Sequence, residues 1–121
     1  MTIKFTNGKT MPYIEAFEGE EYFNGTNRRV LTVYCEKNTI SVDELNDILT
    51  DEKNTAEITL SNEEMGVSNV YDGYVLKLKV GMEQYFVSGE TPEAPAVYED
   101  RIVFKLGKRT YIEEQLKRLG L

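Results

Sequence analysis

The sequence predicts an α+β fold: a mostly antiparallel sheet, or a partly open barrel, of six or seven strands, with one helix inserted after the third strand and a C-terminal helix. Three observations predict this class. Short segments alternate apolar and polar residues, as strands with one buried face do. Turn sequences separate those segments, and a helix-capping pattern interrupts them once. The 121 residues suit one domain, expected to span residues 1–121.

The N-terminal segment predicts a β-hairpin. Residues 2–6 and 9–18 flank Asn7-Gly8, a dipeptide strongly preferred in two-residue hairpin turns. Pro12 lacks a backbone N–H to donate, and an acidic turn at residues 18–21 adds charge. Both features limit the second strand to the edge of a sheet.

The next segment predicts a strand and then a capped helix. A turn over residues 24–27 leads into residues 28–37, which are rich in β-branched and aromatic side chains. Ser41 and Glu44 have the spacing of a capping box, so a helix should begin at Ser41. Its apolar residues recur at helical spacing and predict one face packed on the sheet: Val42, Leu45, Ile48 and Leu49.

The middle of the chain predicts two further strands around a loop. Residues 56–60 form the first strand, and residues 61–69 are polar enough to predict a loop. In residues 74–80 apolar side chains alternate with Lys77 and Lys79, so both lysines should lie on the outward face of the sheet.

The C-terminal part predicts a loop, a strand and a helix. Residues 88–96 contain two prolines and indicate an exposed loop, and residues 101–106 alternate again. A helix follows over residues 110–119, with a narrow apolar stripe made by Ile112, Leu116 and Leu119. We expect this helix to pack on its own domain, because a helix of about ten residues is unstable in water without burial.

Charge and composition restrict the partners. The net charge is −7, which argues against nucleic acids and anionic membranes. Residues 1–64 carry 6 basic and 13 acidic side chains, whereas residues 65–121 carry 8 of each. The N-terminus lacks the pattern of a signal peptide, and no apolar run has the roughly 20 residues of a membrane helix. The expected location is the bacterial cytoplasm or a phage particle assembled there.

Catalytic residues are not indicated. The chain has no histidine, which removes histidine-based catalysis and histidine metal ligands, and its one cysteine, Cys35, fits a small buried hydrophobe. Asp43, Asp47 and Asp51 are spaced four apart but lack the pattern of a calcium loop. No glycine-rich phosphate loop occurs. We therefore expect no catalytic, cofactor-binding or metal-binding residues.

Two sets of residues are candidate protein-interaction sites. Basic side chains should form an outward face on two late strands: Lys77, Lys79, Arg101 and Lys105. The last helix offers Tyr111, Ile112, Leu116 and Leu119. A basic face opposite an acidic one suits head-to-tail contacts between copies, and hence a homo-oligomer. Two ordinary solvated faces are the alternative.

Four segments carry a resemblance to a known group of proteins. They are the opening IKFTNGK, the block RRVLTVYCEKNTISVDELNDILTDEKNTAEITL, the strand YDGYVLKLKV and the closing EDRIVFKLGKRTYIEEQLKRLGL. In this order they resemble small proteins encoded among the tail genes of phages and prophages of Gram-positive bacteria. The resemblance implies a non-enzymatic tail or baseplate component, or an accessory protein of tail assembly, whose partners are other proteins.

Two other functions fit the residues less well. The acidic first half could belong to a soluble binding module or regulator that recognises a basic protein. An enzyme that uses carboxylates and tyrosines is the third reading, but none of the 21 acidic residues is singled out by its context.

Overall fold

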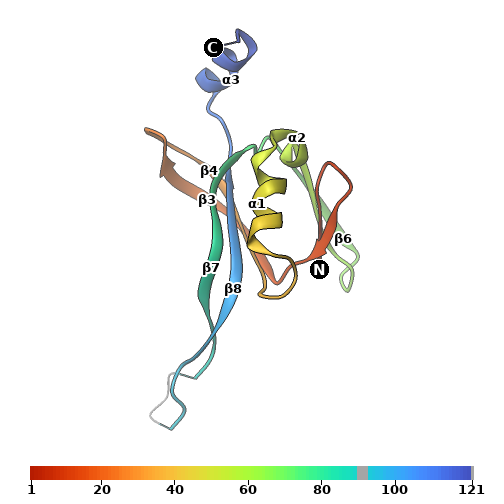
Figure 1. The fold of residues 1–121 in the computed structure, drawn as a ribbon, viewed down its shortest axis with the longest axis vertical. Coiled ribbons are helices and arrows are strands. Elements are labelled where there is room, and N and C mark those ends of the chain that lie inside the picture. The colour runs from red at the N-terminus through yellow and green to blue at the C-terminus, as the bar shows by residue number, and fades with distance from the viewer. Residues whose placement is uncertain (90–92, 121) are drawn as a thin grey trace.

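Two antiparallel sheets of four strands each form the body of the protein in a computed structural model, which describes residues 1–89 and 93–120 (Figure 1). The strand orders are β2-β1-β5-β6 and β3-β4-β8-β7. The elements are β1 (Thr2–Lys4), β2 (Thr10–Pro12), β3 (Glu15–Phe23), β4 (Thr26–Glu36), α1 (Val42–Thr50), α2 (Glu52–Thr55), β5 (Glu57–Asn62), β6 (Val67–Asp72), β7 (Leu76–Ser88), β8 (Val97–Gly107) and α3 (Tyr111–Arg118).

The α+β class is confirmed, but the strand count is not. The described residues form eight strands in two sheets, instead of six or seven in one sheet or partly open barrel. The strand expected over residues 9–18 is divided, because the chain leaves β2 after Pro12 and enters the other sheet as β3. The glutamates at residues 18–21 therefore lie in an edge strand and not in a turn. β6 replaces part of the loop expected at residues 61–69.

The turn between β3 and β4 shows how a local sequence sets the strand register. Phe23 pairs with Thr26, so Asn24 and Gly25 alone make the turn. Their φ angles are +49° and +81°, the left-handed pair that a two-residue hairpin requires. Gly25 adopts this conformation without strain, and asparagine tolerates it better than most residues.

The core lies between the two sheets. β4 and β8 are paired so that alternate residues face inward, and Leu31, Val33 and Cys35 meet Leu106, Phe104 and Ile102 in that order. Ile3, Met11, Ile58 and Leu60 cover them from the other sheet. The interpretation of Cys35 as a buried hydrophobe is confirmed, and burial raises the pKa of its thiol to about 12.

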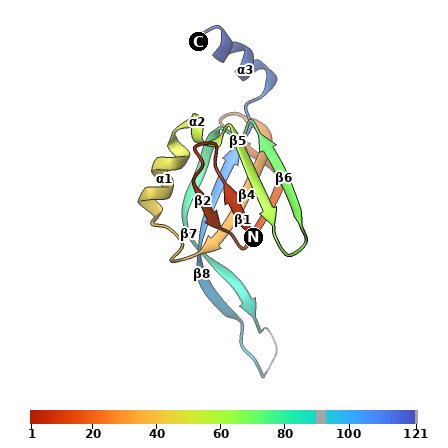
Figure 2. The ribbon, with the colours of Figure 1, turned by 90° about the vertical axis from the view of Figure 1, so that its right-hand side faces the viewer.

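Helix α1 covers one open side of this two-sheet body (Figure 2). It begins as expected at Ser41, whose hydroxyl accepts a hydrogen bond from the N–H of Glu44. Leu45 and Leu49 are fully buried, which confirms the predicted packed face. Lys77 in β7 donates to Asn46 and so joins the helix to the edge of the second sheet.

Two elements extend beyond the body at opposite ends (Figures 1 and 2). Helix α3 stands clear of the sheets at one end. At the other end β7 and β8 continue as a two-stranded ribbon, which we call the hairpin arm: residues 82–88 and 97–100. The loop predicted at residues 88–96 lies at the end of this arm, and residues 90–92 of it are outside the described residues.

In the described part of the chain, no helix combines the length and the apolar character needed to cross a membrane.

Candidate functional site

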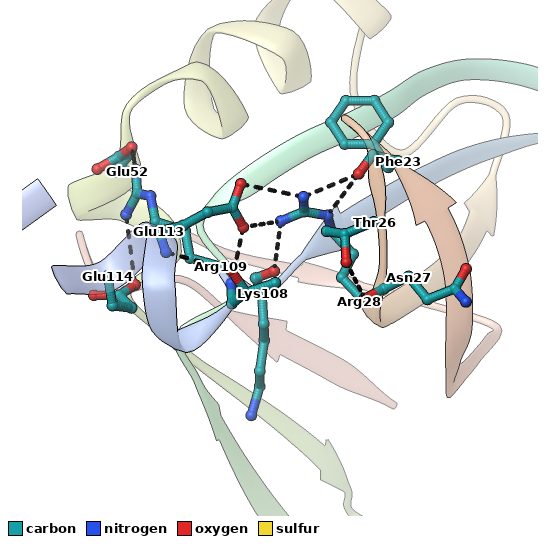
Figure 3. Close-up of polar contacts among 10 residues, drawn as sticks. Phe23, Thr26, Asn27, Arg28, Glu52, Lys108, Arg109, Glu113 and Glu114 are labelled. Carbon is teal, nitrogen blue, oxygen red and sulfur yellow. Dashed lines mark hydrogen bonds and ion pairs between the residues drawn. The ribbon is translucent and has the colours of Figure 1, made fainter. Parts of the chain in front are cut away.

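A buried arginine fixes the chain where it leaves the body for α3 (Figure 3). Arg28 lies in β4, and its side chain is only 1% exposed. Its guanidinium donates to the carbonyls of Phe23 and Lys108, at 2.9 and 3.0 Å. It also binds both carboxylate oxygens of Glu113, in the first turn of α3, at 2.6 and 3.2 Å. This bidentate geometry sets position and direction more strictly than a single contact does.

Glu113 links the arginine to the helix cap. Its carboxylate accepts a hydrogen bond from the N–H of Thr110 at 2.8 Å, and the Thr110 hydroxyl accepts one from the N–H of Glu113. This is a complete capping box, so the start of α3 is fixed internally and against the body at once. Hydrogen bonds from Arg28 and from the Thr110 backbone lower the pKa of Glu113 to about 2.

The passage of Arg28 across the sheet depends on a missing side chain. A Cβ atom at Gly107 would lie 2.8 Å from the Leu78 Cδ1 atom and 3.0 Å from the Arg28 Cδ atom. The last residue of β8 is therefore a glycine at the point where the arginine crosses it.

Further ion pairs orient α3 relative to the body. Arg109 pairs with Glu52 of α2 and with Glu114 of α3 (Figure 3). Lys117 lies 3.7 Å from the same Glu52 carboxylate. Glu113 and Lys117 are four residues apart and therefore occupy one side of the helix. The charged side of α3 thus faces its own domain.

The apolar stripe of α3 faces away from the domain. The exposed fractions are 78% for Tyr111, 70% for Ile112, 43% for Leu116 and 72% for Leu119, and no residue of the helix is buried. The predicted helix is confirmed, but the prediction that it packs on its own domain is wrong. Ionic contacts and a capping box, instead of apolar burial, fix the position of the helix.

The hairpin arm is a second exposed apolar surface. Met82, Phe86 and Tyr98 continue the inward-facing row of β7 and β8 past the end of the other sheet, and each is 45–50% exposed. The rings of Phe86 and Tyr98 meet edge to face at 5.8 Å. The extension of these strands beyond the body was not predicted, because periodicity does not show where the covering sheet ends.

The predicted basic face is wrong in the placement of Lys77. Lys77 pairs with Leu106, which faces the core, whereas Lys79 pairs with Lys105 on the outer face. The pairing of β7 with β8 shifts by one residue between the two lysines, and Leu78 is the extra residue in β7. From Lys79 onward the side chains therefore point to the opposite face from the one that strict alternation predicts. Lys77 consequently reaches α1, where it donates to Asn46 and Thr50.

The remaining basic residues share the outer face of the second sheet, but acidic residues neutralise them. Lys79 pairs with Glu83 and Arg101 with Glu99, while Lys105 lies 3.0 Å from Glu21. The expectation of a basic surface is therefore wrong. Whether these side chains contact another protein stays a prediction.

Aromatic rings complete that outer face. The rings of Phe17, Tyr34 and Tyr85 follow one another at 6.3 and 5.4 Å. The Arg101 guanidinium lies over Tyr85 at 5.5 Å, and the Tyr85 hydroxyl donates to Glu15, which raises the pKa of the tyrosine. Arg101 pairs through its Nη1 atom with Glu99, but its Nε atom is buried and, within the described residues, has no hydrogen-bond partner.

Among residues 1–89 and 93–120, no group of three acidic or cysteine side chains is placed to hold a metal ion. A hollow of about 320 Å³ lies beside the loop after β4. Its charged lining is balanced, with Lys37 and Arg101 against Glu36 and Glu99. It offers no net charge to select an ionic ligand.

No protein-family model, curated protein or solved structure matches the chain. The burial of Arg28 was not predicted from the sequence. No local sequence signal marked its burial, because Gly107, Lys108 and Glu113, which lie against its side chain, are distant in the sequence.

Proposed function

We propose that this protein is a non-enzymatic architectural or adaptor protein, which acts through protein-to-protein contacts in the tail or baseplate of a phage or prophage particle. The observation that carries the proposal is the orientation of α3. Its charged side is bound to its own domain, and its apolar stripe points to solvent. Covering that stripe requires a partner.

The free energy that α3 forgoes by leaving its stripe exposed supports a binding role for the stripe. Burying a leucine or isoleucine side chain contributes about 1.5–3 kcal/mol, and α3 forgoes this gain on its own domain. Arg28 and the capping box hold the helix in a fixed direction before any partner arrives. Such preorganisation lowers the ordering cost of binding. A helix displayed in this way suits a docking element.

The assignment to a phage or prophage particle depends on the resemblance of the four sequence segments. An architectural role agrees with it, since the exposed apolar surfaces lie at two opposite ends of the molecule (Figure 1). Components of an assembly need at least two contact sites to connect neighbours.

A deletion and complementation experiment tests this function. Particles would be purified from the strain that carries the gene, from its deletion strain, and from deletion strains supplied with the wild type or with Ile112→Ser/Leu116→Ser. We expect infectious or complete particles only with the wild-type chain, although the variant domain unfolds at the same temperature. Normal particles from the deletion strain would contradict the proposal.

An acidic binding module is the second candidate, and the surface of α1 favours it. Asp43, Glu44 and Asp47 are all exposed on the side of the helix opposite to its buried leucines. Such a module would bind a basic protein with an affinity that falls steeply with salt. Asp43→Asn/Asp47→Asn would weaken that binding and leave the α3 contacts unchanged.

A further inference from the structure

We propose that α3 of one copy docks on the hairpin arm of a second copy, so that the protein assembles head to tail. This inference rests on the proposed architectural function and names the partner. It uses the two exposed apolar elements of the described chain that extend from the body. The helix presents a basic residue beside its apolar stripe, and the arm presents an apolar face on an acidic ribbon.

The positions of the two elements favour a contact between copies. Helix α3 and the hairpin arm lie at opposite ends of the long axis of the molecule, in both views of the ribbon (Figures 1 and 2). The helix therefore cannot reach its own arm. Three ion pairs to Arg28, Glu52 and Arg109 hold it at its end. Only the arm of another copy can meet it.

The apolar surfaces of the two elements match in length. The stripe made by Ile112, Leu116 and Leu119 runs the length of an eight-residue helix, about 12 Å at 1.5 Å per residue. On the arm, Met82, Phe86 and Tyr98 share one face of the ribbon. Residues 82–86 cover about 13 Å at 3.3 Å per residue. The two apolar surfaces have similar lengths, and each of the six side chains is at least 43% exposed.

Charge also favours a contact between the helix and the arm. Residues 82–100 contain five acidic residues and no lysine or arginine. The last turn of α3 carries the exposed Arg118 beside the stripe, whereas Lys117 is paired with Glu52 and the two glutamates with Arg28 and Arg109. The helix thus presents Arg118 to an acidic ribbon, and the like charges of two ribbons oppose arm-to-arm contact.

The contact has a structural consequence. Each copy would use its helix once and its arm once, on different surfaces, which makes the interface heterologous. Such contacts close into a ring when the rotation between copies allows it, and otherwise extend into a filament. A closed symmetric dimer built from one shared patch is not expected.

Light scattering coupled to size exclusion, over a wide concentration range, tests the proposal with the wild-type chain and two double variants. The helix variant is Ile112→Ser/Leu116→Ser and the arm variant is Phe86→Ser/Tyr98→Ser. The matched control is Met65→Ser/Val70→Ser, which removes equally exposed apolar side chains from the β5–β6 hairpin, 74% and 59% exposed. Unfolding midpoints establish that each variant is folded.

We expect the wild type and the control to associate beyond a dimer as concentration rises, and each double variant to remain a 13.9 kDa monomer. An equimolar mixture of the two double variants should form a heterodimer and stop there. Only one intact helix and one intact arm are then present for each pair of copies. Reversing the charge of the exposed Arg118 with Arg118→Glu should weaken wild-type association several-fold at low salt.

A wild type that stays monomeric at every concentration would overturn the proposal. So would a mixture that forms no heterodimer, or an arm variant that still associates as the wild type does. The proposed function fails separately: a monomeric wild type that is still required for complete particles would reject self-docking and keep the architectural role.

Discussion

Helices α1 and α3 are built by the same local rules and placed in opposite ways. Each begins at a hydroxyl residue, Ser41 or Thr110, whose side chain accepts the N–H of a glutamate three residues later. Each has an apolar stripe at helical spacing. Yet α1 buries Leu45 and Leu49 completely, whereas every residue of α3 remains unburied.

The difference shows that capping decides where a helix begins, and tertiary contacts decide which side it turns to the body. In α1 the apolar side packs under β7. In α3 the side that faces the body is the charged one. Glu113 and Lys117 bind Arg28 and Glu52, which lie at the end of the body from which the helix extends. One helix belongs to the core and the other is displayed.

The largest expected effect comes from equal truncations in the two helices. Leu49→Ala should lower the free energy of unfolding by about 2–5 kcal/mol, because it leaves a cavity in the core. Leu119→Ala, at a side chain 72% exposed, should change it by less than about 0.5 kcal/mol. Urea denaturation of dilute protein measures both. Comparable losses would mean that α3 packs on the body after all.

Removal of the buried arginine should have a smaller but clear effect. Arg28→Met leaves the Phe23 and Lys108 carbonyls without their donor and should cost about 1–3 kcal/mol. Arg29→Met is the matched control, since that neighbouring side chain is 50% exposed and should cost less than about 1 kcal/mol. Amide exchange in α3 should accelerate in the first variant alone. Unchanged exchange there would show that Arg28 does not hold the helix.

The contact between Arg28 and Glu113 should survive mild acid. The pKa of Glu113 falls from its ordinary value of 4.5 to about 2 in the folded protein. A depressed carboxyl pKa stabilises the fold above the unfolded value, and this contribution is lost as pH falls from about 4.5 towards 2. An NMR titration of the Glu113 carboxyl carbon should therefore have its midpoint well below 4.5, and Arg28→Met should return it towards that value. A normal midpoint in the wild type contradicts the bidentate contact.

The smallest expected effect is a difference in stability cost between substitutions of Lys77 and Lys79, which were predicted from the sequence to share one face of the sheet. Lys77→Met removes hydrogen bonds to Asn46 and Thr50 of α1 and should cost about 0.5–1.5 kcal/mol. Lys79→Met removes an exposed ion pair with Glu83 and should cost between about 0 and 1 kcal/mol. Equal costs, measured as shifts of the urea midpoint at constant slope, would place both lysines on one face.

Local chemistry in the sequence was sufficient to predict several elements. The turn at Asn7-Gly8, the helix start at Ser41 and the inward row of residues 102, 104 and 106 all follow from short patterns. The prediction failed where distant contacts decide. The extra residue at Leu78 reverses the two lysines without any turn signal in the sequence.

The candidate site was predicted only in part, again because distant contacts decide the rest. The apolar stripe of α3 was visible in the sequence, but amphipathicity shows only that a stripe needs cover and not which molecule supplies it. The burial of Arg28 depends on Glu113, 85 residues away, and on a glycine at position 107. No local pattern reports such a contact.

Hydrogen–deuterium exchange at two protein concentrations tests the central claim most directly, namely that α3 is a displayed docking helix. In dilute protein we expect the amides of α3 to exchange more than about tenfold faster than those of α1. At high concentration, protection should increase in α3 and in residues 82–88 together, with α1 unchanged. Protection of α3 equal to that of α1 in dilute protein would contradict the account.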